Sequence, residues 1–550
     1  MHSRWYRLLF RRRTRCRVYC ASGRLLAATV AAMLVSCNGG DPPTTADSTA
    51  SSGNSASAKS GGKTDESSGG SVTRTAEGGP RLIILYATCT VNKNYLSPYN
   101  SEIAFTPHLD AFARKSVVFD RHQTEAGQSG IAYASIFTGK QADQHGVYYH
   151  PTRLDDNLYL ISEAFSDAGY ETFFWSGHGM AASDLNYGQG VREKNVSLNM
   201  LSADDEQFQK ILERLKQDPD YKAFVLTNFS VTHSHYAFDQ TALPTFLEKY
   251  PDELGDLPQD QFENYGRLFL TNVFPLSLDF PKVVEANQLN QADVAKLSHT
   301  IDVMYRACVH RLDKLFGAVV SEVEDRNLTD DSLIVFTADH GELLYRENAL
   351  FPWTHGFQLA PEVLNVPLML CGDELKPGRF EGVTRSIDVF PTLAGLCNFE
   401  VDHDQGIAGV DLTSRLRSET AAGHDDLLAY SHTSIRIRAL KENTGRFFDR
   451  FYPTIDPELI WVCIRDNDTV YKWRNLDGTN WGHQVFDLAT DPQETSNLFD
   501  ETNRKHREFA QRLTDYKARL TNAHRPSPLP GSAQDQFRLR QRLRALGYIE

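Results

Sequence analysis

The chain has little cysteine and no paired-cysteine motif. Its eight cysteines are spread irregularly over 550 residues, and none forms a CxxC pair. This excludes zinc sites of the CxxC type and a disulfide-dense scaffold. One or two disulfide bonds stay open if the chain is exported, since the pairing cannot be read from spacing.

Positive charge is scarce outside the N-terminus. The formal net charge is −14, and because the first 36 residues contain eight arginines and neither lysine nor an acidic residue, the remainder carries −22. A protein this acidic lacks the basic surface that binds the phosphates of nucleic acids. We therefore expect no nucleic-acid partner. Anionic substrates stay open, because a bound metal ion can meet their charge locally.

No apolar run near the N-terminus is long enough to span a bilayer. The run at 25–35 follows the arginine-rich segment and has the length of a signal-peptide core. It leads to Leu34-Val-Ser-Cys37, which resembles a bacterial lipobox with Cys37 as the lipidated first residue. The alternative is a plain signal peptide with an incidental cysteine. The arginine triplet at 11–13 is a poor match to a twin-arginine signal.

The next segment has almost no aliphatic residues. Residues 41–80 are mainly Ser, Gly, Thr and Ala, which cannot bury enough apolar surface to order and therefore predict a flexible tether. We expect an exported lipoprotein on the periplasmic face of the envelope or the cell surface, in contact with the membrane through its N-terminal lipid only. Its expected parts are a signal peptide (1–36), a lipidated tether (37–80), a main domain (81–409) and a smaller C-terminal subdomain (410–550).

From residue 81 the chain alternates between strand-like and helix-like segments. Buried-type strands are predicted at 81–86, 116–119, 172–175, 223–229, 333–337 and 366–370. Helices are predicted at 108–114, 131–137 and 296–325. This alternation predicts an α/β fold with a mostly parallel sheet sandwiched by helices. After about residue 410, shorter strands and polar loops lead to predicted helices near 503–522 and 533–546.

The strand at 333–337 ends in a group of ligand-type residues. Asp339, His340, Gly341 and Glu342 follow it almost at once. At the carboxyl end of a parallel strand, an acid and an imidazole can converge on one metal ion, and we expect the glycine to let the backbone approach that ion. The alternative is a polar turn, where Asp and Gly are common.

Other segments match a known family in collinear order. They are TPHLDAFA at 106–113, SGIAYASIFTG at 129–139, THSHY at 232–236, ADHGE at 338–342, HG at 355–356 and FDLATDPQETSNL at 486–498. This series resembles the sulfatase-like branch of the alkaline phosphatase superfamily, over about residues 81–500. The resemblance implies that family's fold, plus a smaller C-terminal subdomain.

The resemblance also implies roles for individual residues. Ser129 aligns with the nucleophile, and its place at a helix start favours an alkoxide and an anionic ester; the alternative is a simple N-cap. Asp339 and His340, with Ser129, would hold a divalent metal. His233 would be the leaving-group acid, and His355 would contact the ester group or bind a second metal.

The sequence departs from the family pattern at two places. The first strand is followed by Ala87-Thr-Cys-Thr90 where the family has metal-binding acids, so Ca²⁺ would lack carboxylates. Cys89, Thr88 or the pair His233 and His235 would favour a softer ion such as Zn²⁺. No Cys-x-Pro-Ser-Arg surrounds Ser129, which excludes the formylglycine modification there, and Tyr133 stands where the family has arginine.

We therefore predict a metal-dependent hydrolase of a sulfate or phosphate ester, in a small molecule or a glycan, that uses Ser129. The metal is Ca²⁺, Mn²⁺ or Zn²⁺. Two alternatives stay open. One is a non-catalytic binding protein that kept the fold, because the strand-end acids are missing. The other is an envelope phosphoryl-alcohol transferase, although such enzymes usually carry several transmembrane helices.

Overall fold

The structure, a computed structural model, describes most of residues 78–523. It leaves out 149–150, 237–240, 347–348, 350, 357, 402–404, 419–426, 434–459 and 477–478 within that range. The predicted signal peptide, the lipobox, nearly all of the tether and the helix near 533–546 lie outside the described residues, so these stay predictions. None of the described helices combines the length and hydrophobicity that a bilayer crossing requires.

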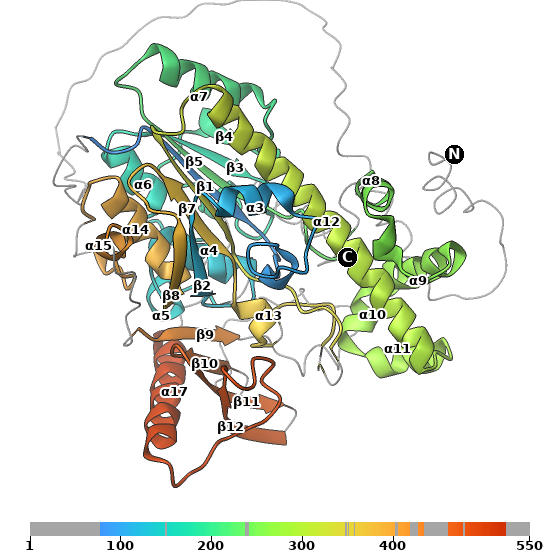
Figure 1. Cartoon of the computed structure of the whole chain (residues 1–550). Coiled ribbons are helices and arrows are strands. Elements are labelled where there is room, and N and C mark those ends of the chain that lie inside the picture. The colour runs from blue at the N-terminus through green and yellow to red at the C-terminus, as the bar shows by residue number, and fades with distance from the viewer. Residues whose placement is uncertain are drawn as a thin grey trace, which may run out of the picture.

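An eight-stranded sheet forms the centre of the larger part (Figure 1). The strand order is β4-β3-β5-β1-β6-β7-β2-β8, and only β7 runs antiparallel to its neighbours. The prediction of a mostly parallel sheet is therefore confirmed. The strands are β1 (Leu82–Thr88), β2 (Val117–Gln123), β3 (Glu171–Ser176), β4 (Val196–Ser197), β5 (Ala223–Phe229), β6 (Ser332–Ala338), β7 (Leu368–Gly372) and β8 (Gly378–Arg385).

Helices cover both faces of this sheet. Alternate side chains of β1 point to opposite faces and pack against different helices. Ile83, Leu85 and Ala87 pack into a core with helices α4 (Ser129–Thr138), α6 (Ile161–Asp167) and α14 (Val389–Leu396). Leu82, Ile84 and Tyr86 pack on the opposite face with α3 (Pro107–Ala113), α7 (Glu206–Gln217) and the long α12 (Gln291–Asp325). A strand buried on both sides reads as a continuous apolar run, as this one does.

The remaining helices are shorter additions. The stretch between β5 and α12 folds into a group of helices beside one end of α12 (Figure 1). These are α8 (Ala242–Lys249), α9 (Gln259–Thr271), α10 (Val273–Leu278) and α11 (Phe280–Ala286). Elsewhere lie α5 (Ala142–His145), α13 (Pro361–Leu364) and α15 (Thr413–Leu416).

Two element boundaries differ from the sequence prediction for identifiable reasons. Helix α12 begins five residues earlier than expected, because the Asn290 side chain accepts hydrogen bonds from the N–H groups of Ala292 and Asp293. Strand β7 begins at Leu368 rather than Val366, because Pro367 has no N–H to give to the ladder.

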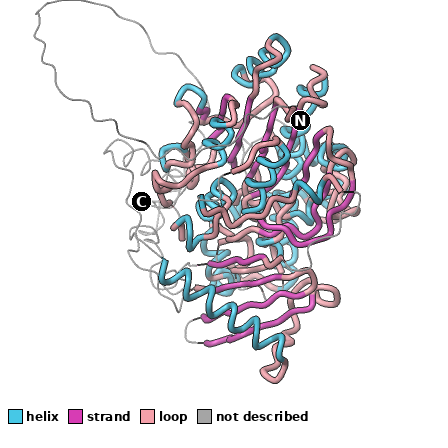
Figure 2. The backbone as a smooth tube through the Cα atoms, turned by 90° about the vertical axis from the view of Figure 1, so that its left-hand side faces the viewer, coloured by secondary structure: helices cyan, strands magenta, loops and turns pink. Residues whose placement is uncertain are grey.

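A four-stranded antiparallel sheet with one long helix forms the smaller part (Figure 2). Its order is β12 (Thr479–Asp487), β11 (Thr469–Leu476), β10 (Trp461–Arg465) and β9 (Ala429–Thr433), with α17 (Arg504–Ala523) packed against it. The helix predicted near 503–522 is confirmed as α17. The edge strand β9 contacts the segment that follows β2 of the large sheet, since the His432 N–H donates to the carbonyl of Glu125 (2.9 Å). That contact fixes the segment that leads to Ser129.

Candidate active site

The carboxyl ends of three neighbouring parallel strands, β5, β1 and β6, meet at one edge of the large sheet. Thr88 of β1 pairs with Ala338 of β6 and with Phe229 of β5, so these strands end level with one another. The residues that follow them, among them Cys89, His233, Asp339 and His340, therefore emerge side by side. This is the edge at which open α/β sheets bind ligands.

Ser129 enters this edge as the first residue of helix α4. It is 1% exposed, and its hydroxyl lies 3.1 Å from Nε2 of His340 and 3.3 Å from Sγ of Cys89. Gln128, not Ser129, occupies the N-cap, and its side chain makes no capping hydrogen bond. The simple capping role is thus not what the structure shows; the Ser129 hydroxyl faces the cluster at the positive end of the helix.

His340 is held in one tautomer by the backbone. Its Nδ1 lies 2.9 Å from the carbonyl oxygen of Gly341, which only accepts, so Nδ1 carries the proton and donates it. The Ser129 hydroxyl then donates to the bare Nε2. Burial, aided by the neighbouring His355, lowers the pKa of His340 well below its usual range. At neutral pH its Nε2 lone pair is therefore free to take a proton or to bind a metal.

Asp339 is fully buried with only half of its carboxylate satisfied. Its Oδ1 accepts the N–H groups of His340 (2.6 Å) and Thr90 (3.3 Å). Its Oδ2 has no hydrogen-bond partner among the described residues and lies 3.5 Å from Nε2 of His340. Burial raises the pKa of Asp339 to about 7. A buried acceptor of this kind is costly unless a cation or a donor meets it.

Cys89 completes a group with metal-ligand spacing. Ligand atoms of Cys89, Asp339 and His340 all lie within 4.8 Å of one another, and the described residues contain no second group of this kind. Thr88, the other ligand that the sequence offered, is excluded because its hydroxyl donates to the carbonyl of Phe229 (3.1 Å). One thiol, one imidazole and one carboxylate are a donor set that fits a borderline ion such as Zn²⁺ and fits Ca²⁺ poorly.

His355 lies on the solvent side of the cluster, paired with an acid. Its Nδ1 is 3.3 Å from both carboxylate oxygens of Glu342, whose side chain is fully buried. Its ring stacks on that of His340 with the centroids 4.5 Å apart. The sequence placed Glu342 in the metal segment but did not reveal this pair.

His233 joins the cluster through His355. The two ring centroids are 4.9 Å apart, and Nδ1 of His233 donates to the carbonyl of Ser234 (2.7 Å). Burial, aided by His355, lowers the pKa of His233 well below its usual range. A neutral His233 therefore presents a bare Nε2, which suits a hydrogen-bond acceptor better than the acid that the sequence predicts.

His178 was not predicted as a site residue. Its ring centroid lies 6.4 Å from that of His233 and 5.9 Å from that of Tyr133. Because His178 follows the carboxyl end of strand β3, as Cys89 follows that of β1, the rule that ligands bind at these strand ends could have pointed to it. The Tyr133 hydroxyl is buried without a partner among the described residues, so it does not substitute for an arginine that would orient the nucleophile.

Gly341 has a different role from the one expected. A Cβ there would lie 2.0 Å from the carbonyl oxygen of Glu362, and the Gly341 N–H donates to the carbonyl of Val363 (2.8 Å). Gly127, two residues before Ser129, would likewise clash with the Val363 side chain at 2.6 Å. That Gly341 also lets the backbone approach a metal stays a prediction. Both glycines allow the loops of the site to pack against the end of α13.

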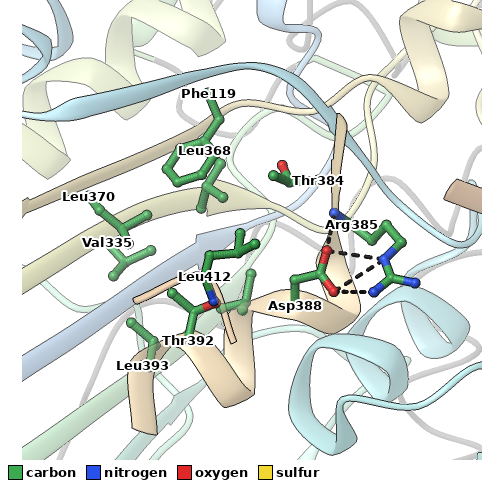
Figure 3. A pocket seen from close by; sticks show the side chains of 11 residues that line it. Phe119, Val335, Leu368, Leu370, Thr384, Arg385, Asp388, Thr392, Leu393 and Leu412 are labelled. Carbon is green, nitrogen blue, oxygen red and sulfur yellow. Dashed lines mark hydrogen bonds and ion pairs between the residues drawn. The ribbon is translucent and has the colours of Figure 1, made fainter. Parts of the chain in front are cut away.

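The pocket in Figure 3 is a separate place in the fold. Its volume is about 10 Å³, room for about one water molecule, and its walls are mostly apolar side chains of β2, β6, β7 and α14. Its polar corner is the ion pair of Arg385 with Asp388. It is too small for an ester substrate and contains none of the residues of the cluster.

Known proteins resemble this chain in sequence and in fold. The family model described as Sulfatase matches residues 83–399. Human N-sulphoglucosamine sulphohydrolase is 25% identical over 443 residues, which cover 73% of this chain and 82% of that relative. A protein solved in complex with its substrate D-glucosamine-2-N,6-O-disulfate shares the fold with a TM-score of 0.60 at 17% identity, covering 81% of this chain and 98% of that one. A phosphonate monoester hydrolase from Silicibacter pomeroyi does so with a TM-score of 0.55 at 19% identity, covering 80% and 94%.

Proposed function

Because this chain belongs to the sulfatase family, whose members hydrolyse sulfuric esters, we propose that it cleaves the sulfate ester of a sugar or glycan with Ser129 as nucleophile. The sugar is suggested by two similar proteins, one named for sulphoglucosamine and one solved with a glucosamine disulfate. The observation that supports the nucleophile is the buried Ser129 hydroxyl, 3.1 Å from the bare Nε2 of His340. A phosphate or phosphonate ester is the second candidate, supported by the phosphonate monoester hydrolase fold match.

The chain's own groups supply the parts of a displacement. In the metal-free site, Nε2 of His340 accepts a hydrogen bond from the Ser129 hydroxyl; with a metal bound, that lone pair would go to the ion instead. The N-terminus of α4 favours negative charge where the ester binds. Asp339 and His340, with Ser129, would hold a divalent metal. Such an ion would neutralise the non-bridging oxygens and favour an ionised hydroxyl.

The leaving group needs a proton. We assign its delivery to His355, because its Nδ1 lies 3.3 Å from both carboxylate oxygens of Glu342, which orient the ring. The Ser129 hydroxyl gives its proton to solvent, its oxygen bonds to sulfur, the bond from sulfur to the ester oxygen breaks, and the His355 proton passes to the departing alcohol. Water then attacks sulfur and gives one proton back to His355; sulfate leaves, and the Ser129 oxygen takes a proton from solvent. His233 accepts a hydrogen bond from the substrate.

The first experiment is ester hydrolysis by the full chain with Zn²⁺, Mn²⁺ or Ca²⁺. The substrates are a nitrophenyl sulfate, glucosamine 6-sulfate, a phosphate monoester, a phosphate diester and a phosphonate monoester. We expect Ser129→Ala to lower kcat/KM by about 10³-fold or more. Ser135→Ala is the matched control, because Ser135 is also buried in α4 but hydrogen-bonds to His145 (3.1 Å), away from the cluster.

The other outcomes separate the alternatives. Equal activity of Ser129→Ala and wild type would overturn the nucleophile. A folded, metal-loaded protein that turns over no ester would be a binding protein. Transfer of the group to an added alcohol but not to water would identify a transferase.

We also propose that the protein is an exported lipoprotein, anchored through Cys37 at the periplasmic face or the cell surface. The support is the lipobox-like sequence and the polar tether behind it. Expressed in a bacterial host, Cys37→Ala is expected to move the protein from the membrane fraction to the soluble fraction. Membrane retention of this variant would contradict the lipid anchor.

A further inference from the structure

The first strand of the large sheet ends in a sulfur donor. Strand β1 is followed by Cys89, which is 0% exposed, and the two residues before it, Ala87 and Thr88, offer no carboxylate. Ca²⁺ takes six to eight oxygen ligands, whereas the ligand group found among the described residues, Cys89, Asp339 and His340, contains one carboxylate. The site is therefore built around sulfur and nitrogen as much as oxygen.

The spacing of these atoms matches a tetrahedral ion. Given bonds of about 2.0–2.3 Å, the ligand atoms of a tetrahedral zinc lie about 3.3–3.6 Å from one another. Nε2 of His340 lies 3.8 Å from Sγ of Cys89 and 3.5 Å from Oδ2 of Asp339. The Ser129 hydroxyl lies 3.3 Å from the same sulfur and 3.1 Å from the same nitrogen. All four distances fit within a few tenths of an ångström.

An independent observation also points to a cation. Oδ2 of Asp339 is buried without a hydrogen-bond partner among the described residues, and it faces the bare Nε2 of His340. When both groups are unprotonated, this oxygen and this nitrogen repel each other at 3.5 Å, and a positive ion between them would remove the repulsion. The thiol of Cys89 lies against the same space.

We propose that Cys89 is a metal ligand, and that Cys89, Asp339 and His340 select Zn²⁺ over Ca²⁺, with Ser129 at the fourth position. Zinc sites with three protein ligands leave that position to the reacting group. The inference rests on the proposed function, since it names the metal of the same site, but its test needs no substrate. Binding releases the thiol proton, because the thiolate is the ligand.

The test measures metal binding by the full chain. After dialysis against equal Zn²⁺ and Ca²⁺, we expect close to one zinc per chain and no retained calcium. X-ray absorption at the zinc edge of the wild-type protein is expected to show one sulfur neighbour at about 2.3 Å. With Co²⁺ in place of zinc, a sulfur-to-cobalt charge-transfer band is expected. The absorption measurement needs no variant, so a misfolded mutant would not leave the inference untested.

Variants then assign the sulfur. Cys89→Ser should abolish the charge-transfer band and weaken zinc binding by at least about tenfold, whereas Cys89→Asp should shift the preference toward Mn²⁺ and Ca²⁺. Cys463→Ser is the matched control, because Cys463 is an equally buried free thiol, in strand β10 of the small sheet.

Two results would overturn the inference: bound zinc without a sulfur neighbour, or a charge-transfer band that survives Cys89→Ser. Zinc with a sulfur neighbour but no ester turnover would keep the inference and refute the proposed function. Ester turnover with Ca²⁺ and no sulfur-bound metal would refute the inference and keep the proposed function.

Discussion

Two buried aspartates at the same side of the large sheet have opposite surroundings. Asp388 accepts hydrogen bonds from the guanidinium of Arg385 (2.6–3.1 Å) and from the backbone N–H groups of Arg385 and Val410 (both 2.8 Å), as Figure 3 shows in part. Within the described part of the chain, no Lys or Arg ion pair is found for Asp339, and its Oδ2 has no hydrogen-bond partner. Both residues are 1% exposed or less.

This difference in hydrogen bonding distinguishes Asp388, which has a structural role, from Asp339, the proposed metal ligand. Asp388 is satisfied from within the chain, so it stabilises the junction of β8 and α14 and needs nothing else. Asp339 is left partly unsatisfied, which costs stability in the absence of a ligand and is retained where a ligand repays that cost. Burial alone would not have told the two residues apart.

Removing the cation beside Asp388 should have the largest effect on stability. Arg385→Leu leaves a buried carboxylate without its partner, and we expect the free energy of unfolding to fall by about 3–5 kcal/mol. Urea denaturation followed by tryptophan fluorescence measures it. A loss below about 1 kcal/mol would show that Asp388 finds another partner and that the contrast with Asp339 is weaker than described.

Asp339→Asn, unlike Arg385→Leu, should change stability little and lower activity strongly. Because the substitution removes a buried, poorly satisfied charge, the metal-free protein at pH 8 should keep its stability within about 1 kcal/mol, or gain some. Turnover should fall by about 100-fold or more, since the proposed metal would lose a ligand. Thermal unfolding with and without zinc, beside kcat/KM, gives both readouts. Strong destabilisation of the metal-free variant would place Asp339 in the same class as Asp388.

A pH series would show whether the segment leading to Ser129 carries a neutral acid. Burial, with Asp388 nearby, raises the pKa of Glu125 from 4.5 to about 8. A folded-state pKa above the unfolded value means that stability is present at low pH and is lost as pH rises from about 4.5 through 8. Glu125→Gln should flatten that decline by about 1 kcal/mol per pH unit. Parallel curves for variant and wild type would contradict the shift.

The smallest effect is expected at an exposed ion pair. Arg114 and Asp110 form an i,i+4 pair at the end of α3 with side chains 67% and 40% exposed. Arg114→Met should change the free energy of unfolding by less than about 0.5 kcal/mol. This variant is the baseline for Arg385→Leu in the same denaturation assay. A larger fall in its free energy of unfolding would mean that the assay also responds to effects other than the loss of an ion pair.

Features that depend on a local sequence pattern, such as strands and helix starts, were predicted well. Strand β5 was expected at 223–229 and is found there, and Asp339, His340 and Ser129 were singled out because a strand end and a helix start are visible in the chain. Cys89 was recognised as a ligand candidate from the missing acids. The family match over residues 83–399 confirms the resemblance that these segments carried.

The parts that were missed depend on which strands lie side by side. The pairing of Glu342 with His355, the approach of His178 and the contact of Gly341 with Glu362 all follow from the strand order and from the loops that cross it. No local periodicity specifies that order. The tautomer of His340 likewise depends on one backbone carbonyl, which a sequence does not place.

Cys89 and His340 are 251 positions apart in the chain. A nascent chain that emerges N-terminus first holds its thiol long before the imidazole and the carboxylate exist beside it. A chain that ends before β6 would lack Asp339 and His340, two of the three proposed ligands. At the proposed site, metal binding would therefore have to wait until β6 has paired with β1.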